Sequence, residues 1–206
     1  MTMQPTLSRS LPRLGWLPWR AALAQGVSQL GSPPLLSIAG ACLCTRASTD
    51  GSALNWALGY SLLAFVAPTL YVVWLFCRGE VDDLHLNDRR QRLRPLCASL
   101  AAAALALALL LVGEAPWFLV VMGAGNLVQG VLFLAITSRW KISAHCTAAG
   151  GLAVLGLGQL DSAGLLLVLC LPLVAWARLY LRRHTLGQVA AGTVLGAGLW
   201  ALILLV

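Results

Sequence analysis

Long apolar stretches separated by short polar gaps run along almost the whole chain. Stretches without a charged residue occupy about residues 26–45, 53–77, 96–113, 115–138, 146–160, 162–177 and 185–206. A helix needs roughly 20 apolar residues to cross a bilayer, and turn-forming or charged residues fall between the stretches. The pattern predicts an all-α, polytopic transmembrane helical bundle with about six to seven spans. It divides the chain into a basic, interfacial N-terminal segment (1–25) and a transmembrane domain (26–206).

The composition strengthens this prediction. Hydrophobic residues make up 59% of the 206 residues and charged residues only 10%, whereas a soluble domain carries about 25% charged residues. The six cysteines show no metal-binding spacing, and most lie within apolar stretches, where a free cysteine packs as a small hydrophobic residue. We therefore expect an integral membrane protein with neither a structural metal nor a disulfide.

The polar gaps carry an asymmetric charge when the chain is followed through seven crossings. All of the 14 lysines and arginines except Arg46 fall on the face that also holds the N-terminus. Lysine and arginine near span ends mark the cytoplasmic side of a membrane protein. We therefore expect the N-terminus and the basic clusters to face the cytoplasm of a bacterium whose inner (plasma) membrane holds the protein.

Two of the basic clusters also contain a histidine. In the third cluster (178–184), Arg178 precedes His184, and Gln188 lies four residues further on, one helical turn from the imidazole. An imidazole at the start of a helix lies beside exposed N–H groups that favour phosphate. The alternative is that His184 is an interfacial histidine and that the arginines only anchor a helix end.

The second cluster (139–145) places Lys141, Ser143 and His145 at alternate positions before a helix rich in small residues. Such a loop can direct an ammonium group, a hydroxyl group and helix-terminal amides at one oxyanion, which leaves His145 to act as a general acid. A basic interfacial loop without chemistry is again the alternative.

The three clusters together resemble the type 2 phosphatidic acid phosphatase superfamily. Arg178-x5-His184-x3-Gln188 is similar to its third signature (Arg-x5-His-x3-Asp), and Ser143-Ala144-His145 is similar to its second (Ser-Gly-His). The first cluster (88–95), which ends in Arg94-Pro95, resembles the first signature, a lysine with six residues before Arg-Pro. The resemblance covers about residues 78–192.

This resemblance implies a metal-independent, cofactor-free phosphatase. His184 would be the nucleophile that forms a phosphohistidine, His145 would protonate the leaving group, and Arg94 and Arg178 would bind the phosphoryl oxygens with help from the Ser143 region. Phosphoryl transfer depends mainly on positioning and charge stabilisation, which agrees with so many cations.

Three positions depart from the signatures. Asn87 stands where the lysine is expected, and Arg89, Arg90 or Arg92 could supply that charge instead. Ala144 replaces glycine, and Gln188 replaces the aspartate that orients the histidine, so no carboxylate stabilises an imidazolium there.

The leading hypothesis is therefore an integral-membrane phosphatase that hydrolyses a lipid phosphate or diphosphate. Two alternatives use the same site: a catalytically weakened member that binds anionic lipids, and a lipid phosphotransferase. A small transporter or channel is disfavoured because the spans lack the buried charges that mark ion pathways. We expect lipid phosphates and membrane lipids as partners and no nucleic acid.

Overall fold

The computed structural model describes residues 18–81 and 89–205, and this part of the chain is helical without any strand. The helices are α1 (Pro18–Leu30), α2 (Pro33–Cys44), α3 (Ala53–Ser61), α4 (Ala67–Cys77), α5 (Arg89–Val112), α6 (Trp117–Thr137), α7 (Ala144–Leu160), α8 (Leu165–Tyr180) and α9 (Leu186–Leu204). Short 3₁₀ turns follow α2 (η1, Thr45–Ala47) and α7 (η3, Asp161–Gly164), and a π-helical segment (η2, Leu62–Val66) joins α3 to α4. The predicted all-α bundle is confirmed.

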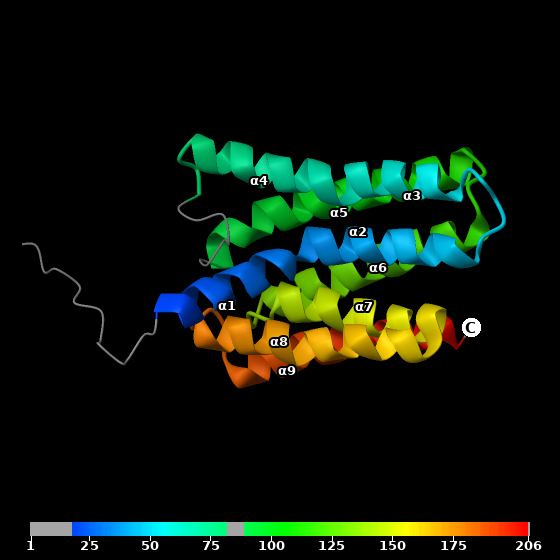
Figure 1. Cartoon of the computed structure of the whole chain (residues 1–206). Helices are drawn as coiled ribbons and strands as arrows, with labels where there is room; N and C mark the ends of the chain where they lie inside the picture. The colour runs from blue at the N-terminus through cyan, green and yellow to red at the C-terminus, as the bar shows by residue number, and fades with distance from the viewer. Residues whose placement is uncertain (1–17, 82–88, 206) are drawn as a thin grey trace, which may run out of the picture.

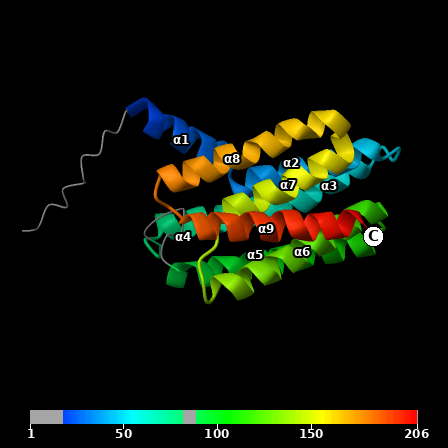
Figure 2. The same cartoon turned by 90° about the horizontal axis from the view of Figure 1, so that it is seen from below.

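The helices run roughly along one axis, and their connections gather at the two ends of the bundle (Figure 1). The start of α1, the end of α4, the start of α5, and the α6–α7 and α8–α9 connections lie at one end, which we call the basic end. The α2–α3, α5–α6 and α7–α8 connections lie at the other end with the C-terminus (Figures 1 and 2). The second and third clusters therefore share one end of the molecule, as the topology predicted.

Five helical segments are long and apolar enough to cross a membrane: Ala53–Cys77, Leu93–Val112, Trp117–Thr137, Ala144–Tyr180 and Leu186–Leu204. A sixth is the pair α1 and α2, which are bent by 46° at the break before Pro33. The segment 144–180 folds back on itself at η3, so that α7 and α8 lie side by side (Figure 2). The protein is thus an integral membrane protein whose apolar segments match the predicted stretches closely.

The N-terminal boundary differs from the prediction. The interfacial segment was expected to end at residue 25, but α1 begins at Pro18 and continues through that boundary to Leu30. The bend follows because Ser32 precedes two prolines, and a residue before proline is disfavoured in the α conformation. Residues 1–17 lie outside the described part of the chain.

The bundle packs around small residues as well as large ones. One buried cluster joins Tyr60, Leu110, Leu119, Met122 and Trp200, while many other large apolar side chains stay exposed on the outer surface, where a bilayer would cover them. α7 lies at the centre, in contact with α2, α8 and α9. The residue that begins α7 is therefore positioned by three neighbouring helices.

Candidate functional site

A cavity of about 560 Å³ opens near the basic end of the bundle. Its lining includes His145 at the start of α7, Arg178 near the end of α8, and His184 in the connection before α9. We call it the mouth cavity. Two imidazoles and one guanidinium group that are far apart in the sequence thus border one space, as the predicted phosphoryl site requires.

His184 lies just outside α9 rather than opening it. Thr185 is the N-cap of this helix, and its hydroxyl accepts a hydrogen bond from the backbone N–H of Gln188. The Gln188 side chain reaches back to the Thr185 backbone N–H, which completes a capping box. The predicted contact between Gln188 and His184 forms, with 3.2 Å between Nδ1 and Oε1, but the helix cap creates it and not a shared helical face.

The capping box also decides which nitrogen of His184 bears hydrogen. The backbone N–H of Thr185 can only donate, so the atom of Gln188 that it meets at 3.2 Å is the carbonyl oxygen. The same oxygen lies against Nδ1 of His184 and can only accept. Nδ1 therefore carries the proton, and in a neutral imidazole the lone pair is on Nε2. That tautomer has its nucleophilic nitrogen on the side of the ring away from Gln188.

Ser143 is the N-cap of α7 and fixes the position of His145. Its hydroxyl accepts from the backbone N–H of Cys146, and Ser143 is fully buried. Its own backbone N–H donates to the carbonyl of Gln188 at 3.1 Å, so the start of α7, which carries His145, is joined directly to the first turn of α9, which follows His184. Ser143 does not line the mouth cavity. The Ser143 hydroxyl caps the helix, which is a structural role, and its predicted help in binding phosphate stays a prediction.

Close packing of α7 on α9 supports this junction. A methyl group added at Gly192 would lie 2.5 Å from the carbonyl oxygen of Ser143, and one at Gly196 would collide with the carbonyl oxygen of Thr147. Both glycines are buried. The Gly192-x3-Gly196 surface therefore serves a contact within the chain, as helices in membranes often use small residues to approach each other.

Arg178 is buried, with only 2% of its surface exposed. Its Nη1 donates to the hydroxyl of Ser28 on α1 at 2.8 Å. Buried guanidinium groups are rare unless hydrogen bonds satisfy them, so α1 supports the cation that borders the mouth cavity. Sequence analysis missed Ser28 because it lies 150 residues away and belongs to no motif.

Arg94 is not brought to the mouth cavity. Its guanidinium pairs with Glu80 at 2.7 Å, and 65% of its side chain is exposed. Pro95 and Leu96, the residues that follow it, do line the cavity. The predicted role of Arg94 in binding the phosphoryl group stays a prediction: in the structure its side chain lies at the surface, where Glu80, in the connection that follows α4, pairs with it.

Among the remaining predicted cations, only Lys141 has a side chain that the structure describes. Lys141 is half-buried in the loop before α7 but does not line the mouth cavity. The side chains of Arg89 and Arg92 lie outside the described part of the structure, and so does Asn87. Among the described residues, Arg178 is the only arginine or lysine that lines the mouth cavity.

The mouth cavity also adjoins the apolar outer surface of the bundle. Leu35 of α2 and Leu70 and Val73 of α4 line it, and all three side chains are exposed on the outer surface of the bundle. The α2 and α4 sides of the opening are therefore apolar, while the histidines and Arg178 form the polar side. Such a division suits a molecule with a charged head group and a hydrocarbon tail.

Comparisons with known proteins identified no similar protein or family. No protein-family model matches the chain, and neither a curated protein nor a solved structure is significantly similar to it.

Proposed function

We propose that the protein is an integral-membrane phosphatase that hydrolyses a lipid phosphate or diphosphate through a phosphohistidine intermediate. The observation that carries this proposal is the meeting of His145, Arg178 and His184, from three separate elements, around one membrane-facing cavity. The hydrogen bond from His184 Nδ1 to Gln188 supports the role of His184 as the nucleophile.

In the first step, Nε2 of His184 attacks the phosphorus atom. The bond between phosphorus and the ester oxygen breaks, and the electron pair stays on that oxygen. His145, as an imidazolium, gives its proton to the oxygen, which leaves as an alcohol or as a phosphate when the substrate is a diphosphate. Arg178 compensates the charge of the phosphoryl oxygens, and the buried setting strengthens this interaction.

In the second step, water attacks the phosphohistidine. His145, now neutral, takes a proton from the water as the phosphorus–nitrogen bond breaks, and inorganic phosphate leaves. Gln188 holds Nδ1 of His184 throughout, so that the ring keeps the orientation needed for attack and release.

The substrate class follows from the surroundings of the site. The opening between α2 and α4 is bordered by exposed apolar side chains. A lipid can therefore reach the histidines from the bilayer with its tail still in hydrocarbon, whereas a small hydrophilic phosphate gains nothing from this wall.

The decisive experiment measures phosphate release from phosphatidic acid, phosphatidylglycerol phosphate and polyprenyl phosphates by the purified protein. His184→Ala should abolish release, and acid-labile, base-stable radiolabel from ³²P-lipid should accumulate on the wild type only. Arg182→Gly is the matched control, since it removes an exposed cation from the same connection. Equal release by the wild type and His184→Ala would refute the assigned nucleophile.

We further propose that the basic end faces the cytoplasm of a bacterial inner membrane. At the opposite end, Arg46 is the only lysine or arginine that the structure describes, whereas the basic end has several. Lysine and arginine near span ends mark the cytoplasmic side. A reporter fused after Val206 should then read as extracytoplasmic, and a cytoplasmic reading would overturn this orientation.

A second candidate is a protein that binds lipid phosphates without turning them over. Gln188 favours it, because a neutral amide orients His184 but brings no negative charge to stabilise an imidazolium. This candidate predicts that vesicles containing phosphatidic acid bind the protein, that Arg178→Ala weakens the binding, and that no phosphate is released. If phosphate instead appears on a second alcohol in the mixture, the same site acts as a phosphotransferase.

A further inference from the structure

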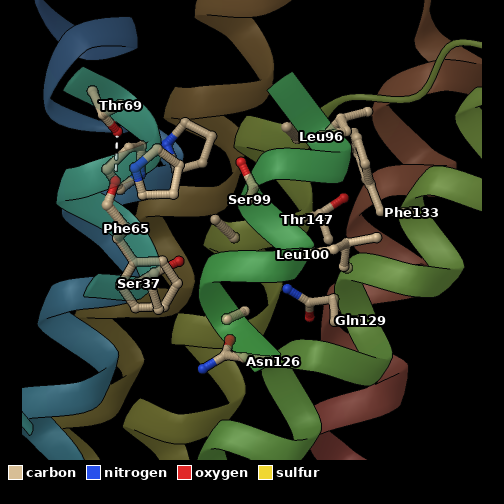
Figure 3. A pocket seen from close by; sticks show the side chains of 18 of the residues that line it. Ser37, Phe65, Thr69, Leu96, Ser99, Leu100, Asn126, Gln129, Phe133 and Thr147 are labelled. Carbon is tan, nitrogen blue, oxygen red and sulfur yellow. Dashed lines mark hydrogen bonds between the residues drawn. The ribbon is translucent and has the colours of Figure 1, made fainter. Parts of the chain in front are cut away.

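A second cavity lies deeper in the bundle, with a volume of about 250 Å³ (Figure 3). We call it the inner chamber. Its walls come from α2, η2, α4, α5, α6 and α7. It shares wall residues with the mouth cavity, among them Pro33, Thr69, Leu96, Phe133 and Ala144. The inner chamber is therefore a continuation of the mouth cavity toward the middle of the bundle.

The side walls of the inner chamber are less polar than their residue types suggest. Thr69, Ser99 and Thr147 line it, but each hydroxyl donates to a carbonyl one turn earlier in its own helix, at 2.7, 2.9 and 3.0 Å. A hydroxyl bonded to its own helix no longer needs another partner. Ser37 of α2 contributes a further hydroxyl, but the other wall residues at this level include Leu100 and Ala103, so most of the wall suits hydrocarbon.

The far end of the inner chamber is polar. Asn126 and Gln129 of α6 lie there, near the middle of that helix (Figure 3). The Oε1 of Gln129 accepts from the indole N–H of Trp200 at 3.1 Å, which leaves the amide N–H groups of Gln129 as donors. A hydrocarbon chain cannot accept hydrogen bonds, so it gains nothing by passing this level. Asn126 and Gln129 thus form a floor.

From this arrangement we propose that the inner chamber binds one hydrocarbon chain of the substrate and limits the length that contributes to binding. The inference rests on the proposed function, because it places the phosphoryl group against the histidines of the mouth cavity. A space of about 250 Å³ equals about eight liquid-water volumes, and a methylene group is of similar size. One chain of about eight carbons fills it, and a second chain of a two-chain lipid stays in the mouth cavity or the bilayer.

The local helix geometry supports a built chamber. The π-helical segment η2 contributes Ala64 and Phe65 to the wall. π-helical turns are rare and occur frequently at functional sites. Phe65 packs edge-on against the buried ring of Tyr60, with centroids 5.7 Å apart, which holds this wall in place.

The test uses a series of water-soluble alkyl phosphates (methyl, butyl, hexyl, octyl and decyl) with the protein in lipid nanodiscs. The wild-type kcat/KM should rise by up to about fourfold for each added methylene group that leaves water and should level off near octyl. Ala103→Phe fills the inner chamber from α5 and should remove this rise while methyl phosphate turnover stays unchanged. Ala104→Phe, one residue further on the exposed side of the same helix, is the matched control and should behave as wild type.

The possible outcomes separate the two proposals. Turnover that is independent of chain length, or identical in Ala103→Phe and Ala104→Phe, overturns the inner chamber but not the phosphatase. If neither the alkyl phosphates nor the lipid phosphates named above release phosphate, the phosphatase fails, and calorimetric binding of the alkyl series to the wild-type protein, which then turns none of them over, decides the chamber. If Ala103→Phe does not fold, Ala103→Leu should instead shift the plateau to a shorter chain, and an unchanged plateau overturns the proposal.

Discussion

The contact between α7 and α9 gives the most direct test of the site. Gly192 and Gly198 both belong to α9, but only Gly192 faces α7. A methyl group at Gly192 would lie 2.5 Å from the carbonyl oxygen of Ser143 and 3.2 Å from the hydroxyl of Thr147, whereas one at Gly198 would meet nothing within 4 Å. Gly192→Ala and Gly198→Ala are therefore a matched pair that differ in packing.

The expected magnitude follows from this geometry. Ordinary contact begins near 3.4 Å, so α9 must move away from Ser143 by about 1 Å, and overpacking of this kind costs about 1–3 kcal/mol. Both variants gain about 1 kcal/mol in helix propensity. The difference between them thus isolates the packing cost, and Gly192→Ala should be less stable than Gly198→Ala by about 1–3 kcal/mol.

The same displacement should reduce activity. Gln188 and His184 belong to the α9 side of the junction, and Ser143 and His145 belong to the α7 side. A misplacement of about 1 Å between catalytic groups can cost about 100-fold in rate.

The assays are unfolding in detergent and phosphate release from the lipid phosphates that the proposed function predicts as substrates. Equal stability of the two variants would contradict the close contact between α7 and α9. A loss of stability in Gly192→Ala without any loss of turnover would contradict the claim that this junction sets the distance between the histidines.

Three further predictions concern the groups around His184 and Arg178. Gln188→Glu keeps the capping box and adds a negative charge beside the imidazole of His184. The kcat for phosphate release should therefore rise by about tenfold. An unchanged kcat would show that charge at this position does not limit the reaction. Ser28→Ala removes the hydroxyl that Arg178 contacts and should lower the free energy of unfolding by about 1.5–3 kcal/mol. Denaturant titration would measure this loss, and an unchanged free energy of unfolding would argue against the buried contact. Arg182 has a φ of 52°, so Arg182→Gly should stabilise the protein by about 1 kcal/mol, and a lower melting temperature would contradict this.

The meeting of three candidate residues around one cavity could be predicted because they lie near span ends. His145, Arg178 and His184 stand in the polar gaps between apolar stretches, and chain topology alone brings those gaps to one end of the bundle. The contact between Gln188 and His184 was predictable as well, because the two residues are close in sequence.

The surroundings of other candidate residues could not be predicted, because they depend on the direction in which each side chain points. Ser143 was assigned to phosphate because hydroxyl groups bind anions, yet it begins a helix and caps it instead. Arg94 was assigned to the same pocket, yet Glu80 lies within reach and holds it at the surface. A short motif fixes the spacing of residues along the chain but not the competition between the partners of each side chain.

The amino-acid sequence by itself determined the helical class, the places where spans begin and end, and the gathering of basic residues at one end, because hydrophobicity and charge act locally along the chain. Only the tertiary structure decided that Ser28 supports Arg178, that α7 and α9 touch through glycines, and that a chamber extends inward to Gln129. These features arise from contacts between distant segments. Packing between helices decides which of these contacts form, and the local sequence pattern does not predict which helix faces will pack together.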